Sequence, residues 1–112
     1  MSHRQERVAR EIRDRLAQIL EQRVADPRLH DVTVTGVKVS SDLSLARVFF
    51  RTLSDSEDRQ KAFESAKPFL RRCLGEEMRL RRVPELDFRV DESLDNAQRI
   101  EQILREIKEE TG

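Results

Sequence analysis

Six basic side chains and only two acidic ones fall between residues 67 and 83. Arginine suits RNA, because its planar guanidinium makes paired hydrogen bonds with phosphates and stacks on bases. An ordinary solvated helix face is the alternative interpretation, and the strong excess of one sign favours nucleic-acid binding. The basic residues of this block are Lys67, Arg71, Arg72, Arg79, Arg81 and Arg82.

The block begins at the segment Ala66-Lys67-Pro68. Proline disfavours helical geometry in the residue before it and fits the first position of a new helix. We therefore expect two helices that meet at a kink here. The free amides of a helix start could bind a phosphate, although a simple corner between helices is the preferred interpretation on physical grounds.

Catalysis and metal binding find no support in the other reactive side chains. We expect residues 1–4, with His3, to be frayed and His30 to lie in a loop, so neither fits beside a nucleophile. Cys73 lies on an apolar stripe and is expected in the core, with no spacing of cysteines or histidines that suits a metal. No cofactor motif is present, and we expect neither a cofactor nor enzymatic activity.

Two adjacent aromatic residues, Phe49 and Phe50, should face opposite sides of a strand. One of them could therefore stack on RNA bases, but core packing is the favoured interpretation for both. Only 4% of residues are aromatic. Recognition through phosphate contacts and the shape of the RNA is therefore favoured over recognition of the RNA sequence by stacking on its bases.

Length and composition favour one domain spanning residues 1–112. Charged residues make up 39% of the chain and apolar residues 37%, while the net charge is +0, so any attraction to nucleic acid must be local. A lone cysteine and a polar start favour a cytoplasmic protein. No apolar run approaches the roughly 20 residues that span a bilayer, so no membrane contact is expected.

Hydrophobic periodicity predicts an α+β domain with elements in the order αββααβα. The first two strands should form a hairpin, and the valines change parity at Gly36, which indicates a bulge. The first helix is expected at about residues 4–25, and a second short helix should start within residues 54–58 and be interrupted at Pro68. Two further helices are expected at about residues 68–81 and 93–110, and the strands at residues 32–39, 45–51 and 84–91.

Three strings carry a resemblance to a known family. They are Asp26-Pro-Arg28, the string TVTGVKVSSDLSLARVF over residues 33–49, and MRLRRVPELDF over residues 78–88. Together they closely resemble the ribosome-binding factor A family, and the resemblance runs from the first helix to the last. It implies a type II KH-like domain of αββααβ order, with a three-stranded sheet packed by helices and an additional C-terminal helix.

The resemblance also implies a function. Members of the family bind the immature 30S subunit near the 5′ end of 16S rRNA and support late maturation, including processing of that end, especially in the cold. They do not cleave RNA themselves. We expect the protein to be a monomer and to have other assembly factors as partners. A charged module that docks ribosomal or other proteins in place of rRNA is the alternative.

The site residues follow from the resemblance together with the charge pattern. The Gly-x-x-Gly loop of common KH domains is absent. The family pattern at the kink is Ala-x-Gly, which this chain matches at Ala66 but not at Pro68, so Ala66, Lys67 and Pro68 are assigned a role in setting shape. RNA contact is assigned to the six basic residues named above and, secondarily, to Lys38, Arg47 and Arg7.

Overall fold

The computed structural model describes residues 2–92, and the C-terminal helix expected at about residues 93–110 lies outside this range. The described elements follow the order αββαβ, with one short 3₁₀ turn after the first helix. They are α1 (His3–Gln22), η1 (Pro27–Leu29), β1 (Val32–Val39), β2 (Leu45–Thr52), α2 (Ser56–Met78) and β3 (Glu85–Val90).

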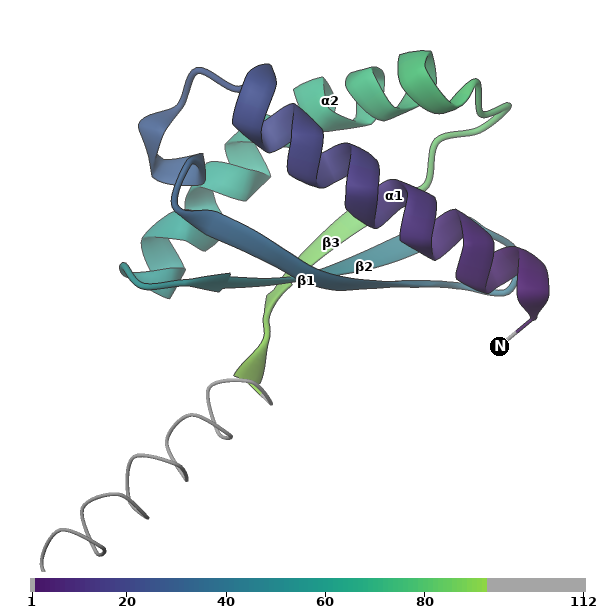
Figure 1. Cartoon of the computed structure of the whole chain (residues 1–112), viewed down its shortest axis with the longest axis horizontal. Helices are drawn as coiled ribbons and strands as arrows, with labels where there is room; N and C mark the ends of the chain where they lie inside the picture. The colour runs from purple at the N-terminus through teal and green to yellow at the C-terminus, as the bar shows by residue number, and fades with distance from the viewer. Residues whose placement is uncertain (1, 93–112) are drawn as a thin grey trace, which may run out of the picture.

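The three strands form one sheet in the order β1-β2-β3, and the two helices lie on the same side of it (Figure 1). β1 and β2 pair antiparallel, which confirms the predicted hairpin, and β3 runs parallel to β2. The register shifts between Val34 and Gly36, which confirms the predicted bulge. The α+β class and the three-stranded sheet packed by helices are therefore as expected.

The start of α1 is fixed by a capping box. The Ser2 hydroxyl accepts a hydrogen bond from the Gln5 amide at 3.2 Å, and the Ser2 amide donates to the Gln5 side chain at 2.9 Å. Gln5 also donates to the carbonyl of Val39 at 3.0 Å, which ties the first turn to the end of β1. The expectation of a frayed segment over residues 1–4 is therefore wrong for Ser2, His3 and Arg4, because satisfied amides stabilise a helix start.

A single helix, α2, replaces the two helices expected around Ala66, Lys67 and Pro68. Proline removes one amide donor and crowds the carbonyl of Glu64, but Phe63 before it and Leu70 after it are both fully buried. Packing on both sides therefore holds the helix together across the proline. The axis of α2 still changes direction between its first and second halves (Figure 1).

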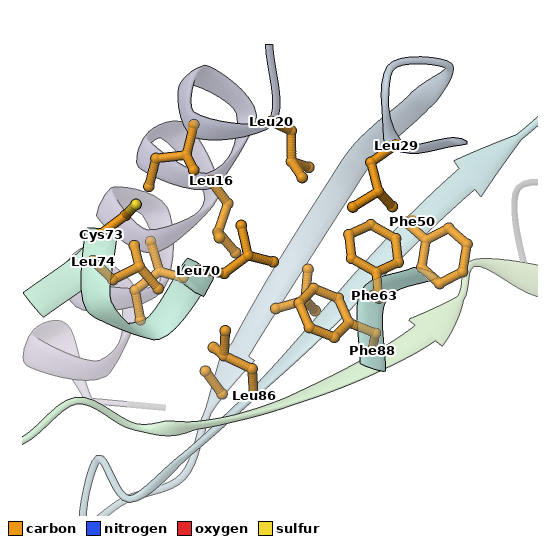
Figure 2. Close-up of a cluster of buried hydrophobic side chains, with 14 of the residues drawn as sticks. Leu16, Leu20, Leu29, Phe50, Phe63, Leu70, Cys73, Leu74, Leu86 and Phe88 are labelled. Atoms are coloured by element: carbon orange, nitrogen blue, oxygen red, sulfur yellow. The ribbon is translucent and has the colours of Figure 1, made fainter. Parts of the chain in front are cut away.

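The core is built from the inner face of the sheet and the facing sides of both helices (Figure 2). Phe63 of α2 stacks on Phe88 of β3 at 4.2 Å between ring centroids and contacts Phe50 of β2 at 4.8 Å. Cys73 is buried between the helices, as predicted. Among residues 2–92 the core contains no charged side chain.

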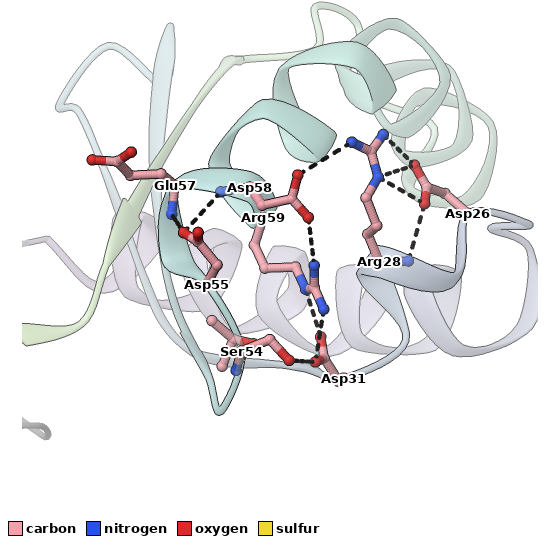
Figure 3. A network of polar contacts seen from close by, with 9 residues as sticks. Asp26, Arg28, Asp31, Ser54, Asp55, Glu57, Asp58 and Arg59 are labelled. Carbon is pink, nitrogen blue, oxygen red and sulfur yellow. Dashed lines mark hydrogen bonds and ion pairs between the residues drawn. The ribbon is translucent and has the colours of Figure 1, made fainter.

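A chain of ion pairs joins the segment before β1 to the start of α2 (Figure 3). Arg59 contacts Asp31 at 2.9 Å and Asp58 at 2.8 Å, while Arg28 contacts Asp26 at 2.8 Å. The hydrogen bonds from Arg59 and then from Ser54 lower the pKa of Asp31 to about 2. These contacts fix where α2 begins relative to the sheet.

We predict that replacing Asp31 with asparagine lowers the free energy of unfolding at pH 7 by about 0.2–1 kcal/mol, the range for exposed ion pairs. The pKa is depressed in the folded state, so the stabilisation is present above about pH 4, the pKa of an unfolded aspartate, and is lost as the pH falls towards about 2. Urea unfolding between about pH 7 and pH 3 should show the difference from the parent shrinking. Asp14→Asn is the control, and a difference that stays constant with pH would contradict the assignment.

Candidate nucleic-acid interface

The structure divides the basic block of residues 67–82 according to what each side chain already contacts. Lys67 pairs with Glu64 at 2.9 Å, one turn earlier on α2. Such a surface pair contributes little stability and can exchange its partner for a phosphate. The Lys67 amine therefore contributes little to stability and can also bind a phosphate.

Arg71 has a structural role. Its guanidinium donates to the carbonyls of Pro84 at 3.1 Å and Val83 at 2.9 Å, and it approaches the Glu85 carboxylate at 3.6 Å. One turn further along α2, a β-carbon at Gly75 would lie 2.9 Å from the Val83 side chain. The missing side chain at Gly75 therefore lets the returning chain pack closely against α2, and Arg71 holds it there.

Arg72 lies over an aromatic ring on the outer side of α2. Its guanidinium carbon is 5.5 Å from the centroid of the Phe69 ring, and that of Arg23 is 5.9 Å from the same centroid. A cation at this distance is attracted by the ring face, by about 0.5–1 kcal/mol at exposed sites. The Phe69 ring thus orients the Arg72 guanidinium, while no acidic side chain within residues 2–92 neutralises its charge. Arg23 and Phe69 were not selected from the sequence, because their contact joins the end of α1 to the middle of α2.

The end of α2 displays the remaining three arginines. Arg79 ends the helix in the left-handed conformation (φ 53°, ψ 40°), which glycine favours and which costs other residues about 1–2 kcal/mol. This ends α2 at Met78, so the expectation that the helix continues to about Arg81 is wrong. Arg81 and Arg82 follow in the exposed loop, and neither they nor Arg79 form a hydrogen bond or ion pair with any of residues 2–92.

We call Arg72, Arg79, Arg81 and Arg82 the α2-end arginines. All four are exposed, and within the described part of the chain none has a carboxylate partner. Charges that the fold does not neutralise keep their attraction for phosphates, and guanidinium groups can bind a phosphate through two hydrogen bonds. This group is the strongest candidate for nucleic-acid contact among the six residues of the block.

Lys38 and Arg47 lie on the other side of the sheet. Ala46 and Val48 are buried against the helices, so the intervening side chain of Arg47 points to the face of the sheet opposite α1 and α2, where it contacts Asp87 at 2.9 Å. The Lys38 amine lies 5.8 Å from the centroid of the Phe49 ring. The core placement expected for Phe49 is therefore wrong, although that of Phe50 is confirmed.

Arg7 is exposed on α1, whereas Lys38 and Arg47 lie on the face of the sheet opposite the helices, so the nine predicted contact residues do not form one surface. Arg7 shares a surface hollow with His3, Arg4 and Arg10. Arg4 and Arg10 were not selected from the sequence, although their spacing of three residues from Arg7 was a usable signal.

Residues 2–92 contain no group of three or more histidine, cysteine or acidic side chains able to hold a metal ion. Burial raises the pKa of the Cys73 thiol, which keeps it protonated and unreactive. The described helices include none with the length and hydrophobicity needed to cross a bilayer.

A sequence model of the ribosome-binding factor A family matches residues 4–104. The chain belongs to this family. It is 44% identical over 107 residues to ribosome-binding factor A of Desulfatibacillum aliphaticivorans, covering 93% of this chain and 87% of the relative. With the Streptococcus mutans protein it shares 40% identity over 111 residues, covering 96% of each.

Solved structures of ribosome-binding factor A share the fold. The crystal structure of the Thermus thermophilus protein superposes with a TM-score of 0.72 at 29% identity, over 77% of this chain and 94% of that one. A homology model of the Thermus thermophilus factor, fitted into a cryo-EM map of a 30S complex, gives a TM-score of 0.67 at 29% identity, covering 76% and 92% of the two chains. The KH-like fold implied by the resemblance is therefore confirmed.

Within the family fold, Pro68 lies where the resemblance implies glycine. Pro68 is exposed and α2 is continuous across it, so the segment Ala66-Lys67-Pro68 does not form a separate helix start. A proline has no amide hydrogen to offer a ligand, and its ring prevents the close backbone approach that glycine permits. What this segment can contribute is the bend of α2 and the Lys67 amine.

We predict that Arg71→Ala lowers the free energy of unfolding by about 1.5–3 kcal/mol, the range for hydrogen bonds to a charged group, because two carbonyls at the start of β3 lose their donor. Arg82→Ala, which removes an equal charge nearby, should change it by less than about 0.5 kcal/mol. Urea unfolding monitored by circular dichroism measures both. Equal, small effects of the two substitutions would show that Arg71 does not hold the loop.

Proposed function

We propose that this protein is an assembly factor that binds the small (30S) ribosomal subunit through its 16S rRNA. The observation that carries the proposal is the group of α2-end arginines, which the fold leaves without acidic partners within residues 2–92. Membership of the ribosome-binding factor A family supports it. So does the Thermus thermophilus relative, whose model was fitted into a map of a 30S complex.

The contacts that these side chains favour are with the RNA backbone. Arginines at a helix end and in the loop after it reach phosphates, whereas aromatic residues that could stack on bases make up only 4% of the chain. Recognition then depends on the shape of the folded rRNA and on the bend of α2 that orients the arginines. Lys67 adds a further cation beside that bend.

The finer parts of the function rest on the family resemblance. The protein acts in the cytoplasm, near the 5′ end of 16S rRNA, late in subunit maturation, and it supports processing of that end without cutting RNA. It acts as a single domain and as a monomer, with other assembly factors as further partners. Its contribution is greatest in the cold, when misfolded rRNA rearranges slowly.

We predict that the protein co-migrates with free small subunits in a sucrose gradient and is absent from translating ribosomes. Incubated alone with a precursor 16S rRNA, the purified protein should leave the 5′ extension intact, since residues 2–92 offer no group of side chains able to hold the metal ion of a metal-dependent nuclease. Primer extension across the 5′ end reads the cleavage. Conversion of the precursor by the pure protein would overturn the non-enzymatic assignment.

For the α2-end arginines, we predict that the double substitution Arg81→Ala and Arg82→Ala weakens binding to small subunits. Each lost phosphate contact should reduce the magnitude of the logarithmic salt slope by roughly 0.7–0.9, because fewer counterions are released. The control is Arg89→Ala, an exposed arginine that pairs with Asp87 at 3.2 Å on the face of the sheet opposite α1 and α2. Unchanged affinity and slope in the folded double variant would remove the rRNA-contact role from this surface.

A further inference from the structure

The first half of α1 carries a second group of cations that form no ion pair within residues 2–92. Arg4, Arg7 and Arg10 follow one another at steps of three residues, so they share one side of the helix. With His3 they line a surface hollow of about 340 Å³. We call these three arginines the α1 stripe.

Acidic residues further along α1 do not neutralise the stripe. Glu11 pairs with Arg15 at 3.7 Å and Asp14 contacts Arg13 at 3.2 Å. An acid that precedes its basic partner by four residues has the better orientation on a helix, so Glu11 favours Arg15 over Arg7. Within residues 2–92, no member of the stripe forms an ion pair.

Among residues 2–10 the one acidic residue is Glu6. It precedes Arg10 by four residues but forms no ion pair with it, and it lines the hollow between α1 and β1 together with Gly36 and Val37. Residues 2–10 carry three arginines against one glutamate, a local net charge of +2 in a chain whose total is +0. The first half of α1 is therefore a local basic surface.

Helix stability does not explain this placement. The N-terminal end of a helix carries a partial positive charge whose effect falls off within the first turn, so Arg4 is slightly unfavourable there and Arg7 and Arg10, in the next two turns, gain nothing from it. The placement becomes favourable when an anion binds over the stripe. The Gln5 hydrogen bond to Val39 at 3.0 Å also keeps the first turn fixed to the sheet, so the arginines are presented on a rigid element.

We propose that the α1 stripe is a second phosphate-binding surface for the RNA backbone, separate from the α2-end arginines. Six residues of helix span about 9 Å, so Arg4 and Arg10 reach different phosphates of one strand. Arginine suits this ligand because its fork of donors matches the phosphate oxygens. The inference rests on the proposed function and adds to it that the protein contacts rRNA at two surfaces.

The test is the double substitution Arg7→Gln and Arg10→Gln, with Arg13→Gln and Arg15→Gln as the matched control. Both pairs remove two charges from the same helix, and glutamine is a good helix former. Within residues 2–92, acidic side chains pair with the two control arginines and not with Arg7 or Arg10. Binding is measured against salt concentration with two probes, purified immature small subunits and a naked transcript of the 5′ region of 16S rRNA.

The stripe variant should bind both probes several-fold more weakly, with a salt slope smaller by roughly 0.7–0.9 for each lost contact. Its thermal midpoint should stay close to that of the parent, because substitutions of exposed side chains that form no ion pair change stability little. The control should keep most of its affinity and its slope. Weaker binding together with undiminished stability would support the inference.

Three outcomes would overturn it. One is an unchanged slope in the stripe variant, and another is an equal loss in the control. Weaker binding to subunits with unchanged binding to the naked transcript would assign the stripe to a ribosomal protein. The variant of Arg81 and Arg82 is measured in parallel, so that if it alone weakens binding, this inference fails while the proposed function stands.

Discussion

The contact between Phe50, Phe63 and Phe88 holds α2 on the sheet, and the arrangement of the basic residues depends on it. The Phe63 ring lies 4.2 Å from that of Phe88 and 4.8 Å from that of Phe50. Beyond Pro68, Leu70 and Leu74 continue the buried side of α2 (Figure 2). Since apolar packing fixes both halves of the helix, the position of the helix that carries the α2-end arginines is set by the core.

Charge pairing then decides which surface residues remain available. The chain has 22 basic and 22 acidic residues, so its net charge offers no general attraction to RNA. Arg59 illustrates the common situation, because Asp31 and Asp58 both contact it (Figure 3). Arg81 and Arg82 have no such partner within residues 2–92, so the attraction for phosphate is local.

The sequence allowed most of the fold to be predicted and less of the site. Alternation along Leu86, Phe88 and Val90 located β3, and the parity change at Gly36 located the bulge. The prediction of two helices meeting at Pro68 was wrong, because it rested on the local tendency of proline to interrupt a helix. The burial of Phe63 and Leu70 on either side, which holds one continuous helix together, depends on tertiary packing. The capping of α1 by Ser2 was also missed, although a serine three residues before a glutamine is a usable signal.

The site was harder to predict because a count of charges along the chain does not reveal their partners. Arg71 and Arg72 are adjacent, yet one donates to the carbonyls of Val83 and Pro84 while the other lies over the Phe69 ring. That difference depends on where the chain returns after α2, which only the folded structure shows. Lys38 and Arg47 were likewise grouped with residues from the opposite side of the sheet.

The proline in α2 also limits which groups of this protein could contact RNA. A glycine at a kink allows a phosphate to approach the backbone closely, and the amides of a new helix start can then bind it. Here α2 is continuous across Pro68, and residue 68 has no amide hydrogen. Under the proposed function, binding would therefore come from side chains that extend from the surface, and the exposed arginines without an acidic partner within residues 2–92 offer the longest reach and a permanent positive charge. On this account the fold contributes the positions of the arginines, and the strength of binding follows the salt concentration.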